Sequence, residues 1–164
     1  MTLEDLKANF DNFLAVSKLP IKGFVIGTTS HFDAEGDFYL TPSRESKLVS
    51  YMGVIVRNVE TALMISALVD GFVNFIFVDA EKKIPKKHFG PNDAGNLEKG
   101  IKGVVKDSTV LTFKGNDLTA RATDSLLRAL MPDITGLKIS VIGTGNIGTK
   151  IAWSLLERGR SEEH

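Results

Sequence analysis

Short runs of apolar, β-branched and aromatic residues alternate with amphipathic segments along this chain, and this order restricts the fold more than any other feature. The β-rich runs that we expect to be strands lie at 22–29, 47–56, 72–79, 108–113 and 137–142. The segments expected to be helices lie at 3–17, 58–71, 94–106, 119–130 and 147–157. Such alternation predicts an α/β fold with a mostly parallel sheet and helices on both faces.

Local signals support individual elements of this prediction. Thr2 followed by Asp5 predicts a capping box at the start of the first helix. Asn58 is expected to cap the second helix and Gly71 to end it. The segment 31–46 contains Gly and Pro among charged residues, which indicates a hairpin or loop with a short edge strand at 37–41.

Charge and composition exclude several functional classes. The 20 basic and 20 acidic side chains cancel, so no basic surplus predicts nucleic-acid binding. No apolar run approaches the roughly 18 residues of a membrane span, and the acidic N-terminus does not resemble a secretory signal, so we expect a cytoplasmic protein. Cysteine is absent and the three histidines are scattered, which argues against disulfides, thiolate chemistry and a metal site.

A glycine pattern follows the last expected strand. Gly143, Gly145 and Gly148 form G-x-G-x-x-G directly before the last helical run. In such a pattern the first glycine permits a tight turn, the second lets a pyrophosphate approach the backbone, and the third lets helix and strand pack closely. The following helix N-terminus offers N–H groups to phosphates. The residues expected to bind a cofactor are Gly143, Thr144, Gly145, Asn146, Ile147 and Gly148. A glycine turn used only for packing is the alternative.

A complete dinucleotide site also needs a second strand, ending about twenty residues beyond the glycines in an acidic residue that binds the ribose. Glu162 and Glu163 have the right position, but no apolar strand separates them from Gly159. We therefore expect a first α/β domain at 1–135, which binds substrate. Residues 136–164 are expected to be the first strand, glycine turn and first helix of an incomplete, truncated Rossmann unit.

Polar side chains follow each of the earlier strands. These groups are Thr28–His31, Arg57 with Asn58, Asp79–Lys83 and Lys114–Asp117. Because the carboxyl ends of parallel strands meet at one edge of a sheet, we expect these groups to share one cleft.

The stretch from Val110 to Gly159, "VLTFKGNDLTARATDSLLRALMPDITGLKISVIGTGNIGTKIAWSLLERG", resembles two-domain NAD(P)-dependent dehydrogenases. This class includes shikimate dehydrogenases, methylene-tetrahydrofolate and methylene-tetrahydromethanopterin dehydrogenases, and amino-acid dehydrogenases. In these families a substrate domain precedes the Rossmann domain, and a polar Asn/Asp/Thr motif closes its last strand. The resemblance implies NAD or NADP as cofactor and hydride transfer to or from a small polar substrate.

The resemblance also implies candidate catalytic residues. "GND" at 115–117 matches the place of an Asn-Thr-Asp motif in shikimate dehydrogenases, which makes Asn116 and Asp117 substrate-binding or catalytic candidates. The middle threonine and the Asn-x-Thr-x-Pro-x-Lys motif of those enzymes are missing here, so shikimate itself is not implied. Lys82 and Lys114 could take the place of that motif's lysine, and only their location in the sequence suggests this.

Hydride transfer needs a group that moves the accompanying proton. A lysine beside an aspartate can do this, and Lys114 and Asp117 lie three residues apart, so we expect them to pair. A solvated loop pair is the alternative. His31 and His88 are further acid or base candidates, with a solvated lysine-rich loop as the alternative for His88.

We therefore expect the N-terminal portion of an NAD(P)-dependent oxidoreductase, inactive or nearly so as a truncated chain. A small non-catalytic α/β protein that binds a phosphate-bearing ligand or a protein partner is the second hypothesis. A nucleotide-binding regulatory domain is the third. The apolar face of an unpaired strand and helix predicts self-association, and hence a homo-oligomer, or docking of this face back onto the first domain.

Overall fold

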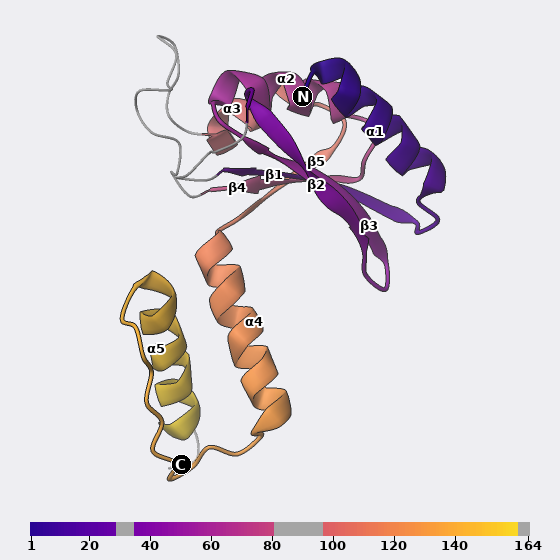
Figure 1. Cartoon of the computed structure of the whole chain (residues 1–164). Helices are drawn as coiled ribbons and strands as arrows, with labels where there is room; N and C mark the ends of the chain where they lie inside the picture. Colours follow the sequence, from indigo (N-terminus) through magenta and orange to yellow (C-terminus); the bar gives the residue numbers. More distant parts are fainter. Residues whose placement is uncertain (29–34, 81–96, 161–164) are drawn as a thin grey trace. The chain divides into compact units, whose positions relative to one another are not determined.

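The computed structural model describes residues 1–28, 35–80 and 97–160, and it divides into two packed units (Figure 1). The sheet unit, 1–113, contains α1 (Leu3–Val16), β1 (Ile21–Thr28), β2 (Phe38–Glu45), β3 (Val49–Val56), α2 (Val59–Val69), β4 (Phe75–Asp79), α3 (Leu97–Val104) and β5 (Thr109–Phe113). The helix unit, 114–164, contains α4 (Gly115–Leu130) and α5 (Asn146–Arg160). The predicted mixed α/β fold with a mostly parallel sheet is confirmed.

The five strands lie in the order β2-β3-β1-β4-β5. β3, β1, β4 and β5 are parallel, and β2 pairs antiparallel with β3 at one edge. β2 is longer than the edge strand expected at 37–41. Pro42 lies where the β2–β3 register shifts between Thr41 and Arg44, a place where proline interrupts the ladder least.

One face of this sheet carries the core. Phe24 and Ile26 of β1 and Ile76 and Val78 of β4 are completely buried there. Helices α1, α2 and α3 supply the facing side chains, and the ring of Phe10 meets that of Phe24 edge-on at 5.6 Å between centroids. The helices therefore form a single layer over one face (Figure 1).

The prediction of helices on both faces is not confirmed, because the helices in the described part of the sheet unit, α1, α2 and α3, all pack on one face. The opposite face carries Val25, Tyr51, Ile55, Phe75 and Phe77, which are half-buried and lie outside the core cluster. The topology explains this difference. The crossovers from β3 through α2 to β4 and from β4 through α3 to β5 both move in the same direction across the sheet. Right-handed crossovers in one direction place their helices on one face, and the step from β1 to β3 uses the antiparallel β2 instead of a helix.

The predicted helix signals are confirmed in this unit. Thr2 and Asp5 form a reciprocal capping box at α1. The Asn58 side chain accepts a hydrogen bond of 2.8 Å from the backbone N–H of Thr61, which makes it the N-cap of α2. Gly71, just beyond that helix, has a φ of +77°, a conformation that glycine adopts without strain.

Asp70 joins the end of α2 to the start of β5. Its carboxylate accepts backbone hydrogen bonds from Lys106 at 2.7 Å, Asp107 at 3.1 Å and Ser108 at 2.7 Å. Burial raises the pKa of Asp70, but the three backbone donors outweigh it and hold the pKa below its usual value of 3.8. The charged form of Asp70 therefore stabilises the sheet unit.

We expect Asp70→Asn to destabilise the sheet unit by about 2 kcal/mol at pH 7, because an amide cannot accept all these bonds. Since the folded-state pKa lies below the unfolded one, this stabilisation is present above about pH 4 and is lost as the pH falls through the folded value. Urea unfolding of wild type and variant at pH 7 and pH 3 measures the difference in their free energies of unfolding. Equal midpoints of wild type and variant at pH 7 would contradict this role.

In the helix unit, α4 and α5 run parallel. Lys150 of α5 forms an ion pair with Asp117 in the first turn of α4. Further along, Arg158 lies 3.4 Å from Asp124 and donates a 2.8 Å hydrogen bond to the carbonyl of Met131 at the end of α4. The N-terminal ends of both helices therefore lie at the same end of this unit (Figure 1). α4 packs with α5, so the packing boundary falls before α4 and not at 135.

The strand expected at 137–142 does not form. The segment runs beside α5 but pairs with no strand in the described ranges, and Ile142 is fully exposed. A strand requires a neighbour for its backbone N–H and C=O groups, which apolar residues alone do not supply. The truncated Rossmann unit therefore remains a prediction.

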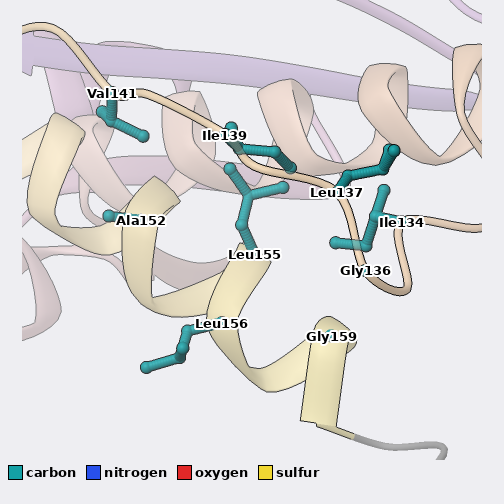
Figure 2. Close-up of a pocket in the computed structure, with 9 residues that line it drawn as sticks. All are labelled: Ile134, Gly136, Leu137, Ile139, Val141, Ala152, Leu155, Leu156 and Gly159. Atoms are coloured by element: carbon teal, nitrogen blue, oxygen red, sulfur yellow. The ribbon is translucent and has the colours of Figure 1, made fainter.

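Apolar side chains of this segment and of α5 line an open pocket of about 320 Å³ (Figure 2). The pocket is lined by Ile134, Gly136, Leu137, Ile139, Val141, Ala152, Leu155, Leu156 and Gly159. Its lining holds no charged side chain, so it does not suit a phosphate. None of the helices in the described ranges is long and apolar enough to cross a bilayer.

Candidate functional site

The three glycines of the turn before α5 differ in geometry. Gly143 has a φ of +100°, which permits the tight turn. A Cβ added at Gly145 would meet no atom within 4 Å, so the backbone there is open to a ligand. A Cβ at Gly148 would overlap the carbonyl oxygen of Gly143, so only glycine lets α5 pack so closely on the turn. Gly143 and Gly148 therefore have the turn and packing geometry that the pattern predicts, whereas the approach of a pyrophosphate at Gly145 stays a prediction.

The start of α5 is electrostatically suited to an anion. The helix begins at Asn146, and the N–H of Thr149 donates to the carbonyl of Gly145 at 2.9 Å. No acidic residue lies in the first turn. The partial positive charge of the helix N-terminus is therefore not neutralised by its own first turn.

The predicted catalytic residues lie at the start of α4, which begins four residues before the predicted start. Lys114 is the N-cap and its carbonyl accepts from the N–H groups of Asp117 at 3.0 Å and Leu118 at 3.1 Å. Asn116 and Asp117 lie in the first turn. The residues "GND" resemble a turn, but Asp117 at this position favours a helix N-terminus.

Asp117 pairs with Lys150 and not, as expected, with Lys114. The hydrogen bond from the Lys150 ammonium is the main cause that lowers the pKa of Asp117, burial opposes it, and the charges of Lys150, Lys114 and Arg121 lower it further. Lys114 therefore acts on Asp117 only through its charge. At neutral pH Asp117 is ionised, so it can accept a hydrogen bond or orient a lysine but cannot donate a proton.

The ion pair brings the two predicted sets of residues together. Asp117 belongs to the candidate catalytic residues, and Lys150 follows the third glycine of the turn by two positions. Both side chains are about two-fifths exposed, at 42% and 38%, so a ligand can reach them. Sequence reasoning missed Lys150, although its position one turn into α5 was a usable signal.

In the sheet unit, the described polar strand ends lie on one edge, and the shared cleft expected of them stays a prediction. Thr28 ends β1, Asp79 ends β4, and Arg57 with Asn58 follow β3, and these strands are parallel. Asn58 is used structurally, because besides capping α2 its amide donates to Asp37 at 3.3 Å. Thr28 donates a 3.4 Å hydrogen bond to Asp79. His31, Lys82 and His88 lie outside the described residues.

Comparisons with known proteins add no family to this description. A scan against protein-family models finds no match to the chain, and a search of curated proteins finds no relative. Any function proposed for the chain therefore depends on its residues and their geometry.

Proposed function

We propose that the glycine turn binds the pyrophosphate of NAD or NADP, and that the chain is the substrate-binding part of an NAD(P)-dependent oxidoreductase with the start of its cofactor domain. The observation that carries the proposal is the division of roles among Gly143, Gly145 and Gly148. A turn used only for packing also needs the close approach at Gly148, and the open space at Gly145 is what leaves room for a pyrophosphate.

The residues present fit such a cofactor. The open backbone at Gly145 leaves room for a pyrophosphate, and the N-terminus of α5 supplies N–H groups and positive charge. Residues 143–148 would hold the phosphates. When bound, the nicotinamide would supply or accept the hydride of the reaction.

The start of α4 offers groups for the accompanying proton and for a polar substrate. Lys150 forms an ion pair with Asp117. A lysine beside an aspartate is the arrangement that the sequence analysis expected of Lys114 and Asp117. In this proposal Asp117 orients Lys150, and the Lys150 Nζ holds the proton that is exchanged with the substrate. Asn116, one residue before Asp117, supplies an amide that can bind a substrate oxygen.

Exposed apolar side chains favour the second hypothesis, a non-catalytic protein that binds a partner. Leu126 and Leu130 of α4 are 61% and 69% exposed, and Trp153 of α5 is 61% exposed. Unpartnered apolar side chains at helical spacing are typical of an interface with a protein or with a second copy. Self-association of the chain is a prediction that depends on the same exposed apolar side chains.

A titration with NADH and NADPH, followed by their fluorescence, tests the proposal. We expect saturable binding by the wild-type chain and at least a tenfold weaker affinity in Gly145→Val, because the new side chain fills the space left for the pyrophosphate. Gly103→Val is the matched control, since a Cβ at Gly103 also meets no atom within 4 Å. Equal affinity in wild type and Gly145→Val would place the ligand elsewhere and contradict the proposal.

A further inference from the structure

The backbone of residues 138–142 forms no hydrogen bond within the described part of the chain. Three of these five residues, Ile139, Val141 and Ile142, are β-branched and therefore favour an extended conformation. An extended run with open N–H and C=O groups on its edges is a template on which another strand can pair.

The side chains of this segment alternate as they do in a β-strand. Leu137, Ile139 and Val141 line the open pocket beside α5 (Figure 2), whereas Lys138 and Ser140 between them do not. Leu137 and Ile139 are nevertheless 54% and 42% exposed. Since α5 covers this apolar row only in part, a neighbouring strand that continues the row would bury more of it.

A local hydrogen bond distinguishes the two edges of the segment. In an extended chain the N–H and C=O of one residue point to the same edge, and those of the next residue point to the opposite edge. The N–H of Leu137 donates to the carbonyl of Ile134 at 3.1 Å, so the edge of Leu137 is partly occupied. Lys138 and Ser140 present their backbone groups on the other edge, which is the open one.

The segment is complementary to itself in the antiparallel direction. Residues 137–141 read apolar, polar, apolar, polar, apolar both forwards and backwards about Ile139. Antiparallel pairing of two copies places Leu137 opposite Val141, so the apolar side chains share one face. The same register places Lys138 opposite the uncharged Ser140. Parallel pairing in register would place Lys138 opposite Lys138, which charge repulsion disfavours.

We propose that residues 137–141 of two copies of this chain pair as antiparallel β-strands about a twofold axis at Ile139. Lys138 of each copy exchanges backbone hydrogen bonds with Ser140 of the other, and the two Ile139 side chains meet on the apolar face. One strand pair is smaller than a standard interface of about 800 Å² per partner, so we expect a weak dimer with a Kd of about 10–100 μM.

Sedimentation velocity and amide hydrogen exchange of the full chain test the pairing. Between about 5 and about 500 μM we expect monomers to convert to dimers, and the protection of the Lys138 and Ser140 amides to rise with concentration. The Ile139 amide should stay unprotected, because it points to the other edge. A monomer at the highest concentration, or protection that does not change with concentration, would overturn the proposal.

Two variants of Ser140 test the backbone hydrogen bonds. Ser140→Pro removes the N–H that donates across the pair, and we expect dimerisation to weaken at least tenfold. Ser140→Val is the matched control, because it keeps this N–H and should dimerise at least as tightly as wild type. Wild-type protection of the Thr149 amide shows that α5 is intact in both. Equal dimerisation of the two variants would contradict the pairing.

Two charged variants test the register independently of proline. Ser140→Glu places a carboxylate opposite Lys138 of the second copy, and Ser140→Lys places an ammonium there, twice in each dimer. We expect Ser140→Glu to dimerise several-fold more tightly than Ser140→Lys at low ionic strength, with the difference shrinking at about 1 M salt. Equal affinities would show that these positions are not opposite each other and would overturn the proposal.

The pairing does not rest on the proposed function, because it involves residues 137–141 and not the glycine turn. NADH titration reports on the amides of residues 143–148. Either proposal can therefore fail while the other is observed.

Discussion

Gly53→Ala is expected to lower the melting temperature of the sheet unit by about 10 °C, corresponding to about 3 kcal/mol or more. Gly53 of β3 lies beside Val25 of β1 in the parallel ladder. A Cβ at Gly53 would overlap the carbonyl oxygen of Val25 and would lie 2.8 Å from the Cβ of Val25. Because the obstacle is the backbone of the neighbouring central strand, no rotamer change relieves it, and β1 and β3 must separate.

Gly103→Ala is the matched control for this prediction. Gly103 lies within α3, and a Cβ there meets no atom within 4 Å. Alanine should therefore stabilise the helix by about 0.5–1 kcal/mol, since it has less backbone freedom to lose on folding. Thermal unfolding followed by circular dichroism measures both variants. A Gly53→Ala protein that melts like wild type would show that β1 and β3 are not packed as described.

Gly148→Ala is expected to disrupt the glycine turn while leaving the sheet unit intact. The new Cβ would overlap the carbonyl oxygen of Gly143, so α5 must move away from the turn or its first turn must unwind. We expect the Thr149 amide, which donates to the Gly145 carbonyl at 2.9 Å, to lose hydrogen-exchange protection. Any binding of NADH should weaken at least tenfold in the same variant.

Gly159→Ala controls for a methyl group added to the same helix. A Cβ at Gly159 meets no atom within 4 Å, so this variant should keep both the Thr149 protection and the affinity of wild type. Hydrogen exchange followed by NMR measures the protection of the Thr149 amide in wild type, Gly148→Ala and Gly159→Ala. Unchanged protection and affinity in Gly148→Ala would mean that the close contact between turn and helix is not required.

Local features of the fold could be predicted from the sequence. The capping box of Thr2 and Asp5, the N-cap Asn58 and the stop at Gly71 depend on residues within a few positions of each other. The β-rich runs of the sheet unit form strands near their predicted bounds for the same reason. The three glycines also show the local geometry expected of their spacing.

Features that depend on distant partners could not be predicted. The single helix layer follows from the strand order, which no local pattern encodes. The segment 137–142 has a strand-like composition but no neighbouring strand among the described residues. Asp117 has Lys114 nearby in sequence, yet its ion-pair partner is Lys150, thirty-three positions away on a helix that packs beside α4. Non-local pairing decides each of these cases.

The central claim is that the glycine turn binds the pyrophosphate of a dinucleotide, and backbone amide shifts test it most directly. Labelled wild-type protein is titrated with NADPH and, in parallel, with inorganic pyrophosphate. We predict saturable shifts of the Gly145, Asn146 and Ile147 amides with both ligands, because these N–H groups lie at the start of α5, where the proposal puts the phosphates. Saturation by neither ligand at these three amides, with shifts only elsewhere, would contradict the claim.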